Sequence, residues 1–108
     1  MPPNLPLKLL RKITDNMNQC AAEITVTGLV HGVGYRYFCT RAAKELSLTG
    51  WVTNNKEETV SIFVEGQRDL IETLIKELAV GPPGSKVKEL DIVWLEYSGC
   101  CKKFEIRY

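Results

Sequence analysis

The sequence predicts one α+β domain in which an antiparallel β-sheet is covered on one face by two α-helices. The chain has 108 residues, a length at which a single hydrophobic core is the rule. Four longer segments have the patterns of β-strands, and two segments between them change to the helical period of 3.6 residues. Strands and helices in this mixed order are typical of a sheet that packs against helices.

The first predicted strand spans residues 23–30 and leads through a glycine-rich turn, residues 31–34, into the first helix. The residues of the strand alternate, with one side formed by Ile24, Val26, Gly28 and Val30. This alternation predicts a half-buried strand. The helix is expected to begin at Tyr35 and to end near Ser47. Its apolar stripe consists of Phe38, Ala42, Ala43 and Leu46.

Two strands and a second helix are expected next. Residues 49–53 and 59–65 have strand patterns, and residues 54–58 between them are predicted to form a hairpin connection. Gly66 is expected to end the second of these strands. The following helix is amphipathic, and we interpret its apolar stripe as core: Leu70, Ile71, Leu74, Ile75 and Leu78. Residues 81–84, Gly-Pro-Pro-Gly, cannot continue a helix.

The last two predicted strands complete the sheet. Residues 90–97 are apolar on both faces, and Phe104, Ile106 and Tyr108 alternate in a short C-terminal strand. The resulting order is βαββαβ with one added strand, which corresponds to two interleaved βαβ units. Because crossovers between parallel strands are right-handed, this order predicts a ferredoxin-like sandwich.

The domain is expected to span residues 21–108, preceded by a flexible N-terminal extension over residues 1–20. The extension contains three of the five prolines of the chain and a polar stretch at residues 14–19. Such segments rarely bury enough apolar surface to order themselves. An arm that binds a partner is the alternative interpretation.

The charge balance bears on possible partners. Fourteen basic and thirteen acidic residues give a net charge of +1, whereas nucleic-acid-binding domains usually carry a strongly basic face. No apolar run approaches the roughly 20 residues that a membrane-spanning helix needs, and the N-terminus lacks the pattern of a secretory signal. We therefore expect a cytoplasmic protein with no nucleic-acid or membrane partner.

The spacing of the cysteines matches neither a disulfide framework nor a CxxC metal site. The four are Cys20, Cys39, Cys100 and Cys101. With His31 as the single histidine, a zinc site would need three or four of these thiols to converge. We expect reduced thiols, and a disulfide or a metal site is the alternative. Cys39 follows the glycine-rich turn, but a phosphocysteine mechanism is disfavoured because it needs a neighbouring base.

The glycine-rich turn is the candidate for chemistry. It precedes a helix N-terminus, where backbone N–H groups lack intrahelical partners and the helix dipole is positive. Gly32 and Gly34 permit backbone angles at which successive N–H groups converge on an anion, and Arg36 can fold back over them. Together these groups suit a phosphoryl group. A plain tight turn with a solvated arginine is the alternative, and the missing Gly-Lys-Ser/Thr ending disfavours a nucleotide P-loop.

Residues 28–36, Gly-Leu-Val-His-Gly-Val-Gly-Tyr-Arg, resemble the signature of the acylphosphatase family. In that signature a glycine, a Val-Gln-Gly-Val core and an aromatic-Arg pair follow the first strand. The resemblance covers residues 22–108 in the right order. Its further matches are Leu46, Leu48, Gly50-Trp51-Val52, Asn54, Val60, Glu65-Gly66, Gly81-Pro82-Pro83, Ser85, Val87 and Phe104-Glu105-Ile106-Arg107-Tyr108.

The resemblance implies a ferredoxin-like fold and hydrolysis of the carboxyl-phosphate bond of acyl phosphates, without metal or cofactor. Arg36 corresponds to the family's phosphate-binding arginine, and Asn54 to the asparagine that positions the attacking water. The implied phosphate-binding loop consists of His31, Gly32, Val33, Gly34, Tyr35 and Arg36. Because a carboxylate is a good leaving group, the reaction does not need a strong acid. It needs groups that bind the phosphoryl oxygens and a water molecule oriented for in-line attack on phosphorus. The implied partners are a small acyl phosphate and inorganic phosphate, and we expect a monomer.

Two positions depart from the family pattern. His31 stands where the family most often has glutamine, and we expect an exposed loop histidine rather than a catalytic one. Glu57-Glu58 stands where Asp-Gly is usual, which removes the residue best suited to a positive φ. The hairpin tip is therefore expected to differ slightly, with activity retained.

Two other function classes remain open. A non-catalytic acyl-phosphate or anion-binding module is one, since related domains occur within larger enzymes that handle carbamoyl phosphate. Asn54 favours the enzyme, because a pure binder does not need it. An RNA-binding domain of the same fold is the other, but the sequence lacks an aromatic-rich strand motif and a basic face. We interpret Trp51 and Trp94 as core or sheet-surface anchors rather than as platforms for a substrate.

Overall fold

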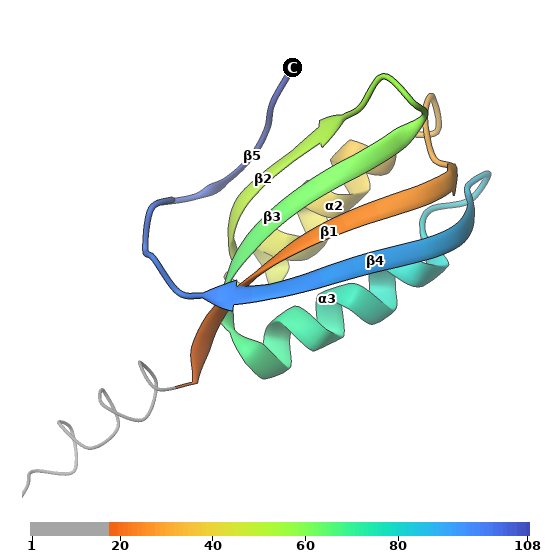
Figure 1. Cartoon of the computed structure of the whole chain (residues 1–108). Helices are drawn as coiled ribbons and strands as arrows, with labels where there is room; N and C mark the ends of the chain where they lie inside the picture. The colour runs from red at the N-terminus through yellow and green to blue at the C-terminus, as the bar shows by residue number, and fades with distance from the viewer. Residues whose placement is uncertain (1–17) are drawn as a thin grey trace, which may run out of the picture.

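The computed structural model describes residues 18–108, and residues 1–17 lie outside the described part (Figure 1). In chain order the elements are β1 (Gln19–Leu29), α2 (Tyr35–Glu45), β2 (Thr49–Asn54), β3 (Thr59–Gln67), α3 (Arg68–Val80), β4 (Lys86–Glu96) and β5 (Phe104–Ile106). This order confirms the predicted βαββαβ arrangement with one added strand. Most of the expected N-terminal extension falls outside the described residues and stays a prediction.

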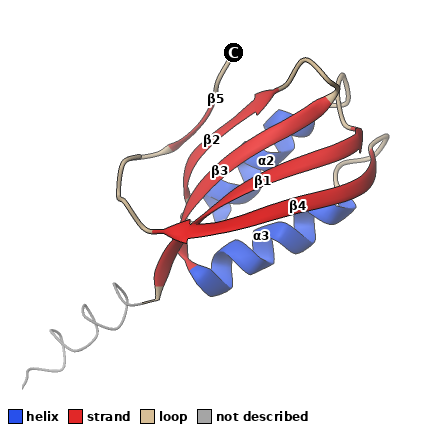
Figure 2. Cartoon of the chain, in the orientation of Figure 1, coloured by secondary structure: helices blue, strands red, loops and turns tan. Residues whose placement is uncertain are grey.

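The five strands form one sheet in the order β4-β1-β3-β2-β5. β1 pairs antiparallel with both β3 and β4, and β2 pairs antiparallel with β3. The added strand β5 runs parallel to β2, so the sheet as a whole is mixed. α2 and α3 lie on the same face of the sheet (Figure 1, Figure 2). The predicted ferredoxin-like sandwich is confirmed, and β5 extends it at one edge.

The hydrophobic core lies between the sheet and the two helices. Alternate residues of the central strands point into it, among them Ile24 on β1 and Ile62 on β3, each 1% exposed. The predicted stripe of α3 contributes the fully buried residues Ile71, Leu74 and Leu78. Tyr35, the first residue of α2, is also buried, and its hydroxyl donates a hydrogen bond to the carbonyl of Leu78 (2.7 Å). This bond ties the start of α2 to the end of α3.

Two strands begin earlier than the sequence predicts: β1 at Gln19 rather than residue 23, and β4 at Lys86 rather than residue 90. At the start of β1, Cys20 pairs with Gly66 on β3 and with Glu96 on β4. The small side chains there do not alternate in polarity, so the pattern does not reveal the strand. The start of β4 is charged because β4 is an edge strand and is exposed there.

The prediction that Gly66 ends its strand is wrong. β3 continues to Gln67, and α3 begins directly after it. Gly66 has a φ of 153°, which other residues rarely adopt, and a β-carbon there would lie 2.5 Å from Leu48 Cδ2, so this position in the strand favours glycine. The predicted stop of the following helix is correct, since α3 ends at Val80, immediately before the Gly-Pro-Pro-Gly segment.

α2 ends at Glu45, close to the predicted end near Ser47. Ser47 takes a left-handed φ of 56°. The N–H of Leu48 donates to the carbonyl of Ala43 (2.9 Å), and the N–H of Ser47 donates to the carbonyl of Lys44 (3.1 Å). These two bonds form a Schellman motif, which satisfies carbonyls at the end of the helix and turns the chain into β2.

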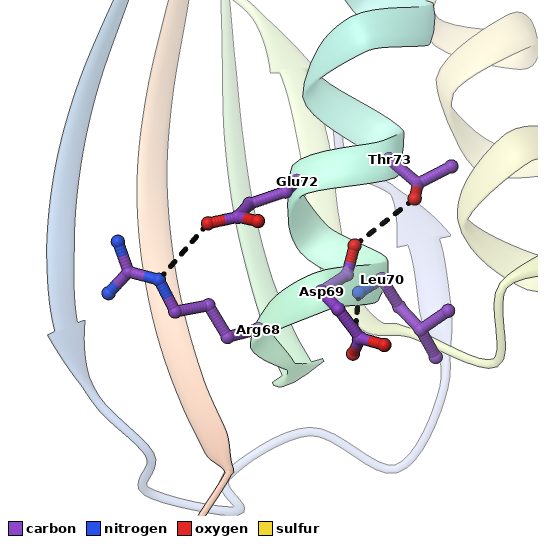
Figure 3. Close-up of polar contacts among 5 residues, drawn as sticks. All are labelled: Arg68, Asp69, Leu70, Glu72 and Thr73. Atoms are coloured by element: carbon purple, nitrogen blue, oxygen red, sulfur yellow. Dashed lines mark hydrogen bonds and ion pairs between the residues drawn. The ribbon is translucent and has the colours of Figure 1, made fainter.

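Polar contacts stabilise the first turn of α3 (Figure 3). The Asp69 carboxylate accepts a hydrogen bond from the N–H of Leu70 (3.0 Å), and the Thr73 hydroxyl donates to the Asp69 carbonyl (3.1 Å). Arg68 forms an ion pair with Glu72 (3.3 Å). An acid in the first turn interacts favourably with the positive end of the helix dipole. The exposed ion pair contributes about 0.3–0.5 kcal/mol.

All four cysteines are free thiols. The sulfur atoms of Cys100 and Cys101 lie 3.4 Å apart and are not bonded. In the described part of the chain, no three His, Cys, Asp or Glu side chains are arranged to hold a metal ion. Over the same residues, neither helix is long and apolar enough to span a membrane.

The two tryptophans contact protein side chains. Trp51 stacks on Phe63 with their ring centroids 6.1 Å apart. The guanidinium carbon of Arg68 lies 4.0 Å from the ring centroid of Trp94. Both tryptophans therefore act as anchors on the sheet.

Candidate active site

The turn over residues 31–34 connects β1 to α2. Gly32 and Gly34 have φ values of 72° and 74°, in the left-handed region that glycine enters without steric cost. Gly34 is also the N-cap residue of α2. Left-handed residues at such positions turn successive N–H groups toward one side, which is how backbone anion sites are built.

The N-terminus of α2 presents unpaired donors and positive charge. The first hydrogen bond of the helix runs from the N–H of Phe38 to the carbonyl of Gly34 (2.9 Å). The N–H groups of Tyr35, Arg36 and Tyr37 therefore have no acceptor within the helix. No acidic residue lies in the first turn of α2 to offset the helix dipole. Arg36 adds a full positive charge at the same end.

Asn54 is the last residue of β2 and pairs with Val60 on β3. Its side-chain oxygen, Oδ1, is buried and has no hydrogen-bond partner among residues 18–108. A buried polar atom without a partner costs about 1–3 kcal/mol, so such atoms are uncommon and often functional. The position of Asn54 Oδ1 therefore favours a hydrogen-bond donor supplied from outside the protein.

The hairpin tip keeps its register although Glu57-Glu58 replaces the expected Asp-Gly. Glu58 takes a left-handed φ of 59°, the conformation that a glycine would adopt with less strain. Asn55 closes the loop, because its N–H donates to the Thr59 carbonyl and its Nδ2 to the Thr59 hydroxyl, both at 2.8 Å. Asn54 consequently stays within the β2–β3 ladder.

One cavity of about 270 Å³ brings the predicted catalytic residues together. Its lining consists of Val30, Gly32, Gly34, Tyr35, Arg36, Tyr37, Asn54, Ile106 and Tyr108. Arg36 from α2 and Asn54 from β2 thus share one cavity with the glycine turn. No Asp or Glu side chain is among the residues that line it. The cavity therefore has the electrostatic character of an anion site.

The side chains of three predicted loop residues have other positions. His31 is half-buried and its Nε2 donates to the carbonyl of Thr59 (2.9 Å), so it is not the exposed histidine that we expected. Val33 packs against the hydrophobic core. The Tyr35 side chain is buried in the core, where burial raises the pKa of its hydroxyl. These residues would bind a ligand at the turn through their backbone.

The cavity also contains C-terminal residues that sequence reasoning did not assign to it. Ile106 belongs to β5, and Tyr108 lies two residues beyond it. The N–H of Arg107 donates to the carbonyl of Val52 on β2 (2.8 Å), which holds this segment beside the strand that carries Asn54. The alternating pattern predicted a terminal strand, but it did not identify the neighbour of that strand.

A larger hollow of about 520 Å³ lies between α2 and α3 and holds none of the predicted site residues. Charged side chains of both signs surround it: Arg41, Glu45, Lys76 and Glu77. Balanced charges and the absence of an open helix N-terminus make this hollow a poor phosphate site. Cys39, the disfavoured nucleophile, is fully buried, and burial raises its pKa.

Known proteins share this sequence pattern and this fold. The acylphosphatase family model matches residues 22–106. The chain belongs to the acylphosphatase family. An acylphosphatase of Syntrophotalea carbinolica is 38% identical over 92 residues, which cover 85% of this chain and 100% of that protein. Together these matches identify the chain as a hydrolase of the acylphosphatase type.

Solved structures extend the family assignment to the fold. The crystal structure of acylphosphatase from Bacillus subtilis matches with a TM-score of 0.80 at 31% identity, over 82% of this chain and 99% of that chain. Full-length HypF in its phosphate- and nucleotide-bound form matches with a TM-score of 0.76 at 34% identity. That match covers 83% of this chain but 12% of HypF, so the same fold also occurs as part of a much larger protein.

Proposed function

We propose that this protein hydrolyses small acyl phosphates to a carboxylate and orthophosphate, without a metal ion or cofactor. The observation that carries the proposal is that Arg36 and Asn54 line one cavity at the open N-terminus of α2. Family membership supports the substrate class. The unpaired N–H groups and the arginine support an anionic phosphoryl group as the part of the substrate that is bound.

The phosphoryl group binds at the turn between β1 and α2. Backbone N–H groups of residues 31–36 donate to its oxygens, and the Arg36 guanidinium adds charge-assisted hydrogen bonds. The planar fork of arginine matches two phosphoryl oxygens at once. Because phosphoryl transfer leaves charge on these oxygens throughout, the same contacts stabilise both the bound substrate and the transition state.

Asn54 orients the attacking water. Its buried Oδ1 accepts a hydrogen bond from the water, so that a lone pair on the water oxygen points at phosphorus. As the new P–O bond forms, the bond between phosphorus and the carboxyl oxygen breaks, and its electron pair leaves with the carboxylate. The proton of the water passes to a phosphate oxygen or to solvent. A carboxylate is a good leaving group, so no general acid is needed.

The proposal includes a monomeric protein in the cytoplasm with no nucleic-acid partner. Four free cysteines support the cytoplasm, and a net charge of +1 disfavours a nucleic-acid partner. Light scattering of the purified protein measures the oligomeric state. A stable dimer would contradict the monomer.

A non-catalytic module that binds acyl phosphate or phosphate is the second candidate. The match to a small part of HypF favours it, because there the fold belongs to a larger protein. Asn54 distinguishes the two candidates, since binding needs the turn and Arg36, whereas hydrolysis also needs an oriented water.

The experiment is to measure hydrolysis of benzoyl phosphate by the purified full chain, with and without a metal chelator. Inorganic phosphate binding is measured in parallel by calorimetry. The proposed enzyme shows turnover that the chelator does not change and that phosphate inhibits competitively. Phosphate binding without turnover would establish the binding module instead. Loss of turnover in the chelator with recovery on adding metal would contradict the proposed mechanism.

A further inference from the structure

The phosphate-binding turn, residues 31–34, lies beyond the last residue of β1 that pairs within the sheet. β1 pairs with β3 as far as Thr27, opposite Thr59, and beyond that point it continues beside β4 alone, to Leu29. β2, which carries Asn54, pairs with β3 and not with β1. No strand pairing therefore joins residues 31–34 directly to Asn54, and the two are linked through β3 alone.

One side-chain hydrogen bond joins the turn to the β2–β3 hairpin that carries Asn54. The Nε2–H of His31 donates to the backbone carbonyl of Thr59 at 2.9 Å. Because a carbonyl only accepts, the hydrogen must reside on Nε2 of the imidazole. Within residues 18–108, no other hydrogen bond joins residues 31–34 to residues 54–59.

The same carbonyl accepts a second hydrogen bond, from Asn55, the residue next to Asn54. The N–H of Asn55 donates to the same Thr59 carbonyl (2.8 Å). Asn55 Nδ2 donates to the hydroxyls of Thr59 (2.8 Å) and Ser61 (2.7 Å). These bonds fix Thr59 relative to Asn55. The hydrogen bond of His31 to Thr59 therefore couples the position of the turn to the position of Asn55 and of its neighbour Asn54.

We infer that His31 is a positioning residue, which sets the turn that binds phosphate at the correct distance from the water-orienting Asn54. This inference rests on the proposed function. The His31 ring does not line the cavity, so it acts on alignment rather than on the substrate. In-line attack depends steeply on geometry, and a misplacement of about 1 Å can cost about 10²-fold in rate. Phosphate affinity is set within the turn and at Arg36, so it is expected to change little.

Three variants test this role. His31→Ala removes the hydrogen bond, and His31→Gln keeps a side-chain N–H that can donate to the same carbonyl. Lys56→Ala is the matched control, because Lys56 is exposed at the tip of the same hairpin and lies outside the cavity. The measurements are kcat and KM for benzoyl phosphate, Ki for inorganic phosphate, and the melting temperature of each variant.

We expect His31→Ala to lower kcat by about tenfold or more, while KM and the phosphate Ki change by less than about threefold. His31→Gln is expected to recover most of the loss, and Lys56→Ala to match the unmodified protein. An unchanged kcat in folded His31→Ala would overturn the inference. A Gln variant as slow as the Ala variant would also overturn it, as would a phosphate Ki that rises as much as kcat falls.

A second measurement keeps the inference separate from the proposed function. If the unmodified protein does not hydrolyse benzoyl phosphate, the proposed function fails while the positioning role can still be judged. The side-chain amide signals of Asn54 in NMR spectra of the phosphate-bound protein report its surroundings directly. These signals should shift in His31→Ala and return in His31→Gln. Signals that are identical in all variants would overturn the positioning role.

Discussion

The ring of Tyr108 lies over the guanidinium group of Arg36, with its centroid 4.9 Å from the guanidinium carbon. The pairing of β5 with β2 brings the C-terminal segment there, since Ile106 lies opposite Val52. A cation–π contact at an exposed site contributes about 0.5–1 kcal/mol. The contact therefore adds a small preference for one orientation of the arginine over the cavity.

Replacing Tyr108 by alanine should weaken phosphate inhibition by roughly two- to fivefold, which corresponds to the loss of about 0.5–1 kcal/mol. Tyr108→Phe keeps the aromatic ring and should match the unmodified protein. The phosphate Ki of both variants checks this. If the phosphate Ki of Tyr108→Phe rises as much as that of Tyr108→Ala, the hydroxyl, and not the ring, matters at this position.

Arg36→Ala should both slow turnover and weaken phosphate binding, because the guanidinium contacts the phosphoryl oxygens before and during the reaction. Arg36→Lys should recover little of either property, since a point charge lacks the planar fork. Phosphate at saturating concentration should raise the melting temperature of the unmodified protein by mass action, and raise it much less in Arg36→Ala. Equal melting shifts in both proteins would place the phosphate site elsewhere.

The carboxylate of Glu65, on β3, holds the loop between β4 and β5. It is 1% exposed and accepts hydrogen bonds from the N–H (2.7 Å) and hydroxyl (2.9 Å) of Ser98 and from the N–H of Gly99 (3.4 Å). Burial alone would raise the pKa of Glu65. The hydrogen bonds from Ser98, Gly99 and Cys100 outweigh burial, and the pKa lies below its ordinary value of 4.5.

A lowered folded-state pKa means that Glu65 stabilises the fold at pH values above its ordinary pKa. This contribution is lost as the pH falls through the lower folded-state pKa. Glu65→Gln should therefore destabilise the protein near neutral pH by about 1–3 kcal/mol, and the difference from the unmodified protein should shrink in acid. Urea unfolding at a series of pH values measures both effects. A difference that stays constant with pH would contradict the assignment.

Glu58→Gly should stabilise the protein by about 0.5–1 kcal/mol. A left-handed conformation costs a non-glycine residue about 1–2 kcal/mol, and the larger conformational entropy that glycine loses on folding offsets part of this gain. Glu57→Gly is the control, since Glu57 has no positive φ and should gain nothing. Thermal unfolding of the two variants decides between them. Activity should not change, because neither residue lines the cavity.

Much of the fold follows from residue patterns. The alternation around Ile24 and the stripe from Leu70 to Leu78 placed β1 and α3, because a core-facing strand and helix must repeat with their own periods. The ends of strands were less predictable. Cys20 lies in a run of small residues without alternation, and the strand continues through Gly66 because Gly66 pairs with Cys20 on β1, a long-range contact.

The candidate site was predicted less from periodicity than from the family resemblance. Spacing alone favoured a plain turn over an anion site at Gly32, Gly34 and Arg36, and nothing in the patterns linked Asn54 to it. Their proximity depends on strand order and on hairpin register, which are long-range properties. The hydrogen bond of His31 to Thr59 and the placement of Tyr108 depend on the same long-range packing, so no local signal could have identified them.

Turnover of Asn54→Ala, measured together with its phosphate Ki, tests the central claim most directly. The amide orients a water and carries no charge for phosphate to lose, so binding should stay within a few-fold of the unmodified protein. Loss of one preorganised hydrogen bond of this kind costs about 2.7–4 kcal/mol, which predicts a fall in kcat of about 10²–10³-fold. Circular dichroism and the melting temperature confirm that the variant is folded. A near-normal kcat, or a phosphate Ki as high as that of Arg36→Ala, would contradict the assignment of phosphate binding to Arg36 and of water orientation to Asn54.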